Sequence, residues 1–406
     1  MLFQSVIGQK EIKQQLVQMI RQNRLGHALL FLGKEGSGAL PLAIAFANYV
    51  SLPKNLVPQQ KEPSLFGDEP VTDKIIADPV TPEEIDAWMQ QQPAWSKLHD
   101  MVHPDIHYSY PVVPKKSGDK PISTDYINEW RRFINENPYG NVYDWLQFIN
   151  AENKQGNITV HECADIIRKM NLKSFESRFK VLIMWMPEML GKEGNKLLKL
   201  IEEPPPDTLF ILVAENESLV LPTILSRTQL IKVPPLSALD IESALALREG
   251  VSLQKSQQVA AISEGNYHEA QQQLHHADDD WEVLLRDWLN SIVKTGPAAQ
   301  LTWIESVSKI GREKQKQLLK YFTHILEMAI RLRVIPPASG QEDRPDVIFA
   351  VKFNNLCDIS QLEAIAQELD QAAYHIERNA NAKILFHALT IKLYHIISNK
   401  SVILIQ

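Results

Sequence analysis

The sequence predicts an α/β domain built on a parallel sheet, followed by all-helical domains. Three observations support this prediction. Short apolar runs alternate with helical periods as far as residue 235, and a glycine-rich turn joins the first apolar run to a helix. After Pro234 and Pro235 only amphipathic helical periods remain. Strands that alternate with helices favour a parallel sheet that is covered on both faces.

The composition is that of a folded multidomain protein. The chain has 406 residues, of which 44% are hydrophobic and 22% are charged, and this length favours two or three domains. Apolar stretches stay shorter than the roughly 20 residues of a membrane span, and the N-terminus lacks a signal-peptide pattern. We therefore expect a cytoplasmic protein without membrane contact. The net charge of −7 argues against a protein that grips DNA mainly through a broad basic surface.

The first segments are a strand, a turn and a helix, in the order that a phosphate-binding loop requires. An amphipathic helix over 10–20 precedes the apolar run 27–33, which predicts a buried strand. A helix is expected over 41–50, with Pro41 in its first turn. The turn at 33–40 reads Gly-Lys-Glu-Gly-Ser-Gly-Ala-Leu.

This turn keeps the glycines of the loop G-x-x-x-x-G-K-[ST] but lacks its two reactive side chains. Ala39 stands where the lysine would contact the outer phosphates, and Leu40 stands where the hydroxyl would hold Mg²⁺. Lys34 comes too early in the loop to substitute for the lysine. An ordinary glycine-rich strand-to-helix turn explains the same octapeptide, so both interpretations stay open. The degenerate loop comprises Gly33, Gly36, Gly38, Ala39 and Leu40.

Residues 53–157 differ in character from the segments around them. They hold 12 of the 24 prolines and four of the eight tryptophans. So many aromatic residues argue against disorder, and we expect an ordered insertion with loops. His103, Asp105 and His107 form a weak metal-binding constellation, and a polar turn before a strand that begins near Tyr108 explains them better.

Regular alternation resumes at residue 158. A helix around 162–170 precedes a strand over 179–185, and a helix over 192–203 precedes a strand over 208–213. Pro204, Pro205 and Pro206 end the second helix.

The change of pattern after residue 235 sets the domain boundaries. We expect an α/β domain over 1–235 and helical domains over 236–276 and 277–406, with clear helical periods at 364–373 and 382–394.

Five separated segments together carry a family resemblance. They are Val6–Gln9, 33–40, His103–Tyr108, Asn195–Pro205 and Leu221–Thr228. Together they resemble the delta-prime subunits of the bacterial DNA polymerase III clamp loader, within the AAA+ clamp-loader group. The resemblance covers essentially the whole chain. It implies an AAA+-like N-terminal domain of the P-loop NTPase type, an all-α lid and an all-α collar that mediates oligomerisation.

The resemblance also implies an arginine finger. In this family an arginine in a Ser-Arg-Cys triplet projects toward ATP held by the neighbouring subunit, and it matches Arg227, with Ser226 in the same motif. Thr228 replaces the cysteine of the triplet. A guanidinium suits this task because its fork of donors can stabilise charge on the transferring phosphoryl group. A surface arginine paired with a carboxylate is the alternative.

Positions that active relatives use for hydrolysis are replaced. Trp185 and Met186 stand where relatives place an Asp-Glu pair, and neither can bind a hard cation. Glu188 lies two positions beyond the family glutamate, and we take it as a turn residue. Residues 214–215 occupy the region of a sensing hydroxyl. His268 replaces the arginine of the second sensor motif, and we expect it at the surface.

Cysteine usage argues against a zinc site. Cys163 and Cys357 are the two cysteines of the sequence, so neither a disulfide framework nor a Cys₄ site is available. Many relatives bind zinc through four cysteines beside the first helix, and we expect no zinc in this chain.

The resemblance implies a non-hydrolysing stator in a hetero-oligomeric complex that loads the sliding clamp onto primed DNA. We expect no tightly bound cofactor and no activity of the chain alone, with ATP bound by the neighbouring subunit. The complex would belong to a DNA-directed DNA polymerase holoenzyme. Expected partners are the motor (gamma/tau) and delta subunits, the sliding clamp through a weak contact, and primed DNA through the complex. The alternatives are an active AAA+ ATPase motor that uses a displaced lysine such as Lys34, and a DNA-binding scaffold.

Overall fold

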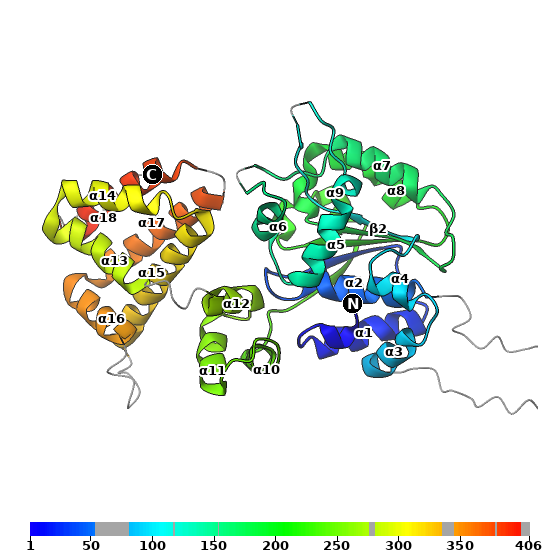
Figure 1. The fold of residues 1–406 in the computed structure, drawn as a ribbon, viewed down its shortest axis with the longest axis horizontal. Helices are drawn as coiled ribbons and strands as arrows, with labels where there is room; N and C mark the ends of the chain where they lie inside the picture. The colour runs from blue at the N-terminus through cyan, green and yellow to red at the C-terminus, as the bar shows by residue number, and fades with distance from the viewer. Residues whose placement is uncertain are drawn as a thin grey trace, which may run out of the picture. The chain divides into compact units, whose positions relative to one another are not determined.

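The computed structural model describes residues 1–52, 81–116, 118–152, 154–275, 281–334, 345–377 and 380–398. The chain forms two compact units, Met1–His276 and Ala277–Gln406, each with its own hydrophobic core (Figure 1). None of the described helices combines the length and the apolar composition that crossing a membrane requires.

A parallel sheet forms the centre of the N-terminal unit, which confirms the predicted AAA+-like α/β class. In the described residues it has five strands in the order β2-β3-β4-β1-β5. The central strand β4 pairs with β3 and β1, and every pair is parallel. The strands are β1 (Ala28–Leu32), β2 (Ile106–Ser109), β3 (Lys180–Trp185), β4 (Thr208–Ala214) and β5 (Gln229–Lys232).

The two edge strands differ from what the sequence indicated. β2 lies within 53–157, so this segment is not only an insertion, because it supplies a strand of the central sheet. The sequence did not predict β5, in which Ile231 alone is buried. A four-residue strand that exposes most of its side chains has no apolar run to reveal it.

Helices cover both faces of the sheet because successive strand residues point to opposite sides. Leu29 and Phe31 of β1 belong to one core cluster, and Leu30 belongs to another. The first cluster includes residues of α1 (Lys10–Arg21), α2 (Ala39–Val50), α3 (Pro82–Gln90), α4 (Trp95–His99), α5 (Ile127–Glu136) and α6 (Val142–Phe148). The second includes residues of α7 (Val160–Met170), α8 (Leu198–Glu202) and α9 (Pro222–Leu225).

The single helix expected over 192–203 is wrong. The chain forms 3₁₀ turns, η4 (Pro187–Leu197), and then the short helix α8. Gly191 interrupts the helical backbone with φ 56° and ψ −157°. Further 3₁₀ turns are η1 (Phe3–Ser5), η3 (Ser123–Tyr126) and η5 (Glu217–Leu219).

Three helices complete the N-terminal unit and form what we call the α10–α12 module. Leu245 and Tyr267 of this module share a small core with Ile7 and Tyr139 from the sheet region. Ser237 and Ser252 cap the first two helices by accepting hydrogen bonds from backbone N–H groups. The helices are α10 (Ala238–Arg248), α11 (Leu253–Ile262) and α12 (Tyr267–His275).

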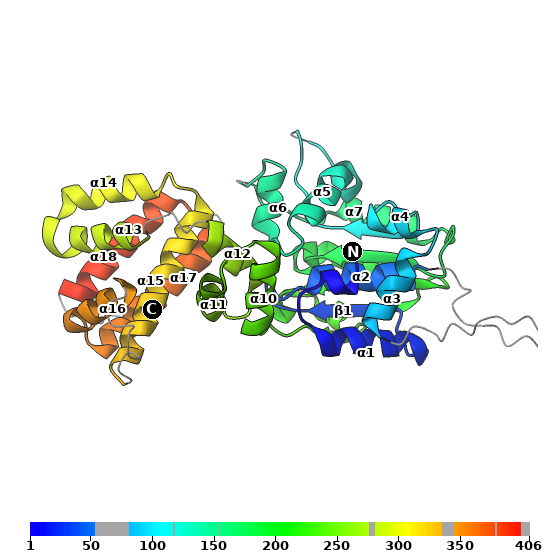
Figure 2. The ribbon, with the colours of Figure 1, turned by 60° about the horizontal axis from the view of Figure 1, so that its bottom comes forward.

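The C-terminal unit is helical throughout its described residues, as Figure 2 shows from a second side. Trp288 and Trp303 stack with ring centroids 4.4 Å apart. The Trp288 Nε1–H donates to Thr390 Oγ1 at 3.0 Å. The helices are α13 (Trp281–Asn290), the π-helical turn η6 (Ser291–Thr295), α14 (Pro297–Val307), α15 (Arg312–Leu332), α16 (Pro345–Leu356), α17 (Ile359–Glu377) and α18 (Ala382–Ser398).

Candidate functional site

The degenerate loop lies between β1 and α2, as the sequence predicted. The Gly33 N–H donates to Ala214 O at 3.1 Å and so ties the end of β1 to the end of β4. Gly38 is the N-cap of α2 with φ 88°, a left-handed conformation that favours glycine. The side chains of Ala39 and Leu40 are buried in the core. Neither of these two side chains can supply the cation or the hydroxyl of a working loop.

The α10–α12 module contacts the loop at Gly36. The Tyr267 N–H donates to Gly36 O at 3.2 Å, and Gly36 has φ 70°. A Cβ on Gly36 would lie 1.8 Å from Asn266 Oδ1. Only glycine permits this close approach, so the loop is a docking point for protein backbone.

The connection between α5 and α6 covers the loop from another direction. The buried ring of Tyr139 would lie 3.1 Å from a Cβ built on Gly38. Its Oη accepts a hydrogen bond from the Ile7 N–H at 2.7 Å. The ring also meets Tyr267 edge to face, with centroids 5.0 Å apart. These contacts hold Tyr139 against the loop.

The cavity that remains at the loop is small. It has a volume of about 30 Å³ and is lined by the loop together with Pro138, Tyr139 and Trp185. A volume of this size holds a water molecule, whereas small-molecule sites typically occupy roughly 300–1,000 Å³. The phosphates of a nucleotide do not fit into this cavity.

Aromatic packing fills the side of the site where a hydrolytic relative would bind its metal. Trp185 ends β3, and its ring centroid lies 5.3 Å from that of Trp130 and 6.3 Å from that of Phe133. Tyr110 stacks on Trp130 at 4.0 Å. The next residue, Met186, is also buried. None of these groups is the oxygen ligand that Mg²⁺ prefers, so the residues present do not fit a bound metal–nucleotide complex.

Glu188 acts as a turn residue after β3, as expected. Its Oε1 accepts hydrogen bonds from the N–H groups of Glu215 and Asn216, at 2.6 and 2.9 Å. Burial raises the pKa of the Glu188 carboxyl, although these backbone N–H groups oppose the rise. The carboxylate therefore joins the ends of β3 and β4.

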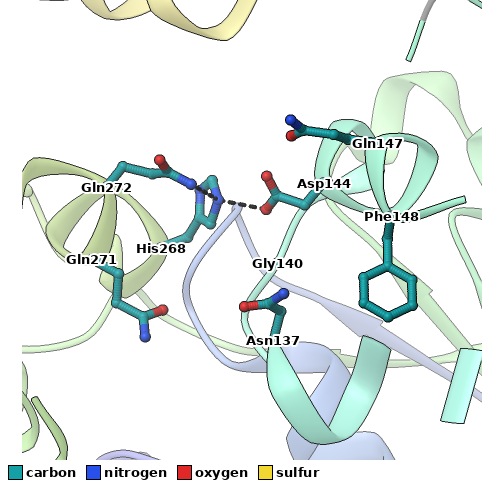
Figure 3. A pocket seen from close by; sticks show the side chains of 8 residues that line it. All are labelled: Asn137, Gly140, Asp144, Gln147, Phe148, His268, Gln271 and Gln272. Atoms are coloured by element: carbon teal, nitrogen blue, oxygen red, sulfur yellow. Dashed lines mark hydrogen bonds and ion pairs between the residues drawn. The ribbon is translucent and has the colours of Figure 1, made fainter. Parts of the chain in front are cut away.

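His268 is buried, and its expected place at the surface is wrong. The residue is 4% exposed on α12. Its Nδ1 lies 2.9 Å from Glu35 Oε1 in the loop, and its Nε2 lies 2.6 Å from Asp144 Oδ2 on α6. Figure 3 shows the contact with Asp144. One imidazole therefore connects the degenerate loop, α6 and the α10–α12 module.

The pKa of His268 shows how strongly this arrangement favours the imidazolium. Burial by itself lowers the pKa, but the hydrogen bonds and charges of Asp144 and Glu35 outweigh it and raise the pKa to about 10. His268 is therefore charged at neutral pH and forms a buried ion triad with the two carboxylates.

A polar pocket of about 280 Å³ opens beside this triad (Figure 3). Asp144, His268 and Phe148 line it together with the amide side chains of Asn137, Gln147, Gln271 and Gln272. It is separate from the small cavity at the loop in its lining, apart from Gly140.

Arg227 lies apart from the degenerate loop and does not line its cavity. It follows α9, and its side chain is 34% exposed. Its Nη1 donates to Thr223 O at 2.8 Å and to Ser226 Oγ at 2.9 Å. Its Nη2 forms an ion pair with Glu202 of α8. The guanidinium is thus accessible from outside the unit and held by its own neighbours.

The weak metal constellation around His103 has a structural use. The Asp105 carboxylate accepts backbone N–H bonds from Phe175, Glu176 and Ser177 at 2.6, 2.8 and 2.9 Å. His103 Nε2 lies 3.3 Å from a Glu176 oxygen. In the part of the chain that the structure describes, no group of three or more His, Cys, Asp or Glu side chains is arranged to hold a metal ion.

Sequence reasoning did not find Tyr139, Glu35 and Asp144 as parts of this site. The Pro138-Tyr139-Gly140 turn within the tryptophan-rich segment was the available signal for Tyr139. Nothing local in the sequence connects Glu35 or Asp144 with His268.

Comparisons with known proteins agree with the motif resemblance. Residues 74–237 match the family described as DNA polymerase III, delta subunit. DNA polymerase III subunit delta' of Bacillus subtilis is 35% identical over 77 residues, which cover 19% of this chain and 23% of that protein. This chain is related to the clamp-loader subunits of DNA polymerase III.

Two further relatives extend the comparison. DNA polymerase III subunit gamma/tau of Mycobacterium tuberculosis is 37% identical over 90 residues, which cover 19% of this chain and 16% of that protein. The solved gamma subunit-related protein of Thermotoga maritima has 14% identity and a TM-score of 0.37, with 93% of this chain and 98% of that chain covered. The chain matches less than a quarter of the length of either curated relative.

Replacing His268 by Gln tests the buried triad. The change removes the cation but leaves two carboxylates in place, so we expect the free energy of unfolding to fall by roughly 3–5 kcal/mol. The folded pKa lies above the unfolded value of about 6.5, so the loss is complete below that pH. It shrinks as the pH rises toward about 10.

Urea unfolding of both proteins between pH 6 and pH 10, followed by tryptophan fluorescence, measures this difference. His161→Gln on α7 is the control, because His161 is half-buried and lies outside the triad. A His268→Gln loss that does not change with pH would contradict the ion triad.

Proposed function

We propose that this chain is the delta-prime-type stator of a DNA polymerase III clamp loader. In this role it holds the geometry of a complex that loads the sliding clamp onto primed DNA, and it hydrolyses no ATP itself. The observation that carries the proposal is the degenerate loop, which lacks its lysine and hydroxyl and is covered by Tyr139. The relation to clamp-loader subunits supports the choice of complex.

The closed loop supports a chain that works without its own nucleotide. A working site needs a cation on the outer phosphates and oxygen ligands for Mg²⁺. Ala39, Leu40 and Trp185 provide none of these groups. We propose that the ATP of the complex is bound by a neighbouring motor subunit and that this chain binds neither a tight cofactor nor zinc.

The exposed guanidinium of Arg227 supports a role in trans. An arginine that reaches the neighbour's γ-phosphate stabilises the charge that develops during phosphoryl transfer. Arg227 has the exposure and the motif context, with Ser226 beside it, that such a finger needs.

The partners of the proposed role are the motor (gamma/tau) and delta subunits, with a weak contact to the sliding clamp. We propose that the helical C-terminal unit is the part that assembles with the other subunits, and that primed DNA is met through the complex. The net charge of −7 agrees with DNA contact that is local or supplied by partners.

Restoring the two lost side chains tests whether the loop is closed. The variant Ala39→Lys with Leu40→Thr should still fail to bind Mg²⁺–ATP, because Tyr139 and Trp185 occupy the surrounding space. Isothermal titration calorimetry of the unaltered chain and of this variant should detect no binding at micromolar concentrations. A thermal melting curve checks that the variant folds, since Leu40 is buried. Micromolar binding with Mg²⁺-dependent turnover by the unaltered chain would favour the active-motor alternative.

Arg227→Ala tests the finger in a complex reconstituted with the motor and delta subunits. The complex should assemble normally, because the side chain is partly exposed. DNA-stimulated ATPase activity should fall by a factor on the order of 10³, the low end for a removed arginine finger, at the one ATP site that this residue serves. Lys232→Ala, at an exposed residue of β5, is the matched control. Unchanged ATPase activity and clamp loading in the Arg227→Ala complex would remove the finger assignment.

A further inference from the structure

We propose that Glu202 is a positioning residue for Arg227. The inference rests on the proposed function, because Glu202 would act only through the guanidinium of Arg227. Glu202 is the last residue of α8, and its carboxylate pairs with Arg227 Nη2. Through this pair it would set the direction in which the finger projects.

The contacts around Arg227 divide the five N–H groups of its guanidinium into two sets. Nη1 is occupied by Thr223 O and Ser226 Oγ, and one N–H of Nη2 is directed to Glu202. Nε and the second N–H of Nη2 have no assigned partner among the described residues. These two groups lie along one edge of a planar guanidinium, the edge that donates two parallel hydrogen bonds to a phosphate. The observed contacts therefore fix the plane and keep a donor edge available.

The backbone that carries the pair is well anchored on both sides. Leu200 and Ile201 of α8 and Ile224 of α9 are buried in one core cluster. Pro204 follows α8 closely and prevents the helix from continuing. Glu202 and Arg227 are thus presented from two short helices whose places are set by shared packing.

The pair itself is too exposed to be needed for folding. The side chain of Glu202 is 42% exposed and that of Arg227 is 34% exposed, and exposed ion pairs contribute little to stability. Holding a long side chain in one geometry matters more for catalysis, because a misplaced group loses much of its effect on the rate. A phosphoryl group bears more charge than a carboxylate, so the finger can engage it without being trapped by Glu202.

The test uses the reconstituted complex of this chain with the motor and delta subunits, the sliding clamp and primed DNA. Glu202→Ala should lower the kcat of DNA-stimulated ATP hydrolysis roughly three- to tenfold, with KM for ATP unchanged because the neighbour binds the nucleotide. Glu202→Asp should restore part of the rate. Glu203→Ala is the matched control, an exposed glutamate one residue away. In an Arg227→Ala background, Glu202→Ala should cause no further loss.

Each outcome separates this inference from the function it rests on. If Arg227→Ala leaves the rate unchanged, the proposed finger fails and the positioning role fails with it. If Arg227→Ala lowers the rate but Glu202→Ala behaves like Glu203→Ala, the finger stands and the positioning role is overturned. An equal loss from Glu202→Ala with and without Arg227 would show that Glu202 acts independently of the finger and would also overturn the positioning role.

Discussion

Protein groups take the place of phosphate at the turn between β1 and α2. In a working loop the backbone N–H groups and a cation surround the anion of the nucleotide. In this chain the loop carries its own anion, Glu35, and His268 balances that charge from α12. Asp144 completes the triad from α6, so the loop has become the point where three parts of the N-terminal unit are joined. A buried charge of this kind is costly unless its partners stay in place.

The aromatic cluster follows from the same change. Once no metal is bound at the end of β3, a large apolar side chain can occupy that position, and Trp185 packs on Trp130 and Phe133. The segment after residue 81 supplies these rings, the edge strand β2 and the covering Tyr139. The tryptophan-rich segment is therefore part of the core, and it closes the place where a nucleotide would otherwise sit.

The sequence predicted the parts of the fold that have a strong local pattern. β1, β3 and β4 are buried on both faces and give unbroken apolar runs, whereas β5 buries one residue and gives no signal. The degenerate loop and Trp185 were found because a motif fixes their positions. His268 was misplaced because a lone histidine on an amphipathic helix looks solvent-exposed until its partners are known, and these partners come from distant segments.

Hydrogen exchange of the backbone amides at 33–40 tests most directly whether the chain closes its own loop. Mass spectrometry would follow the isolated protein with and without Mg²⁺–ATP. If Tyr139 and the α10–α12 module occupy the site, these amides exchange slowly and at the same rate in both conditions. Protection that appears only with Mg²⁺–ATP would contradict a closed loop and would indicate that the chain still binds nucleotide.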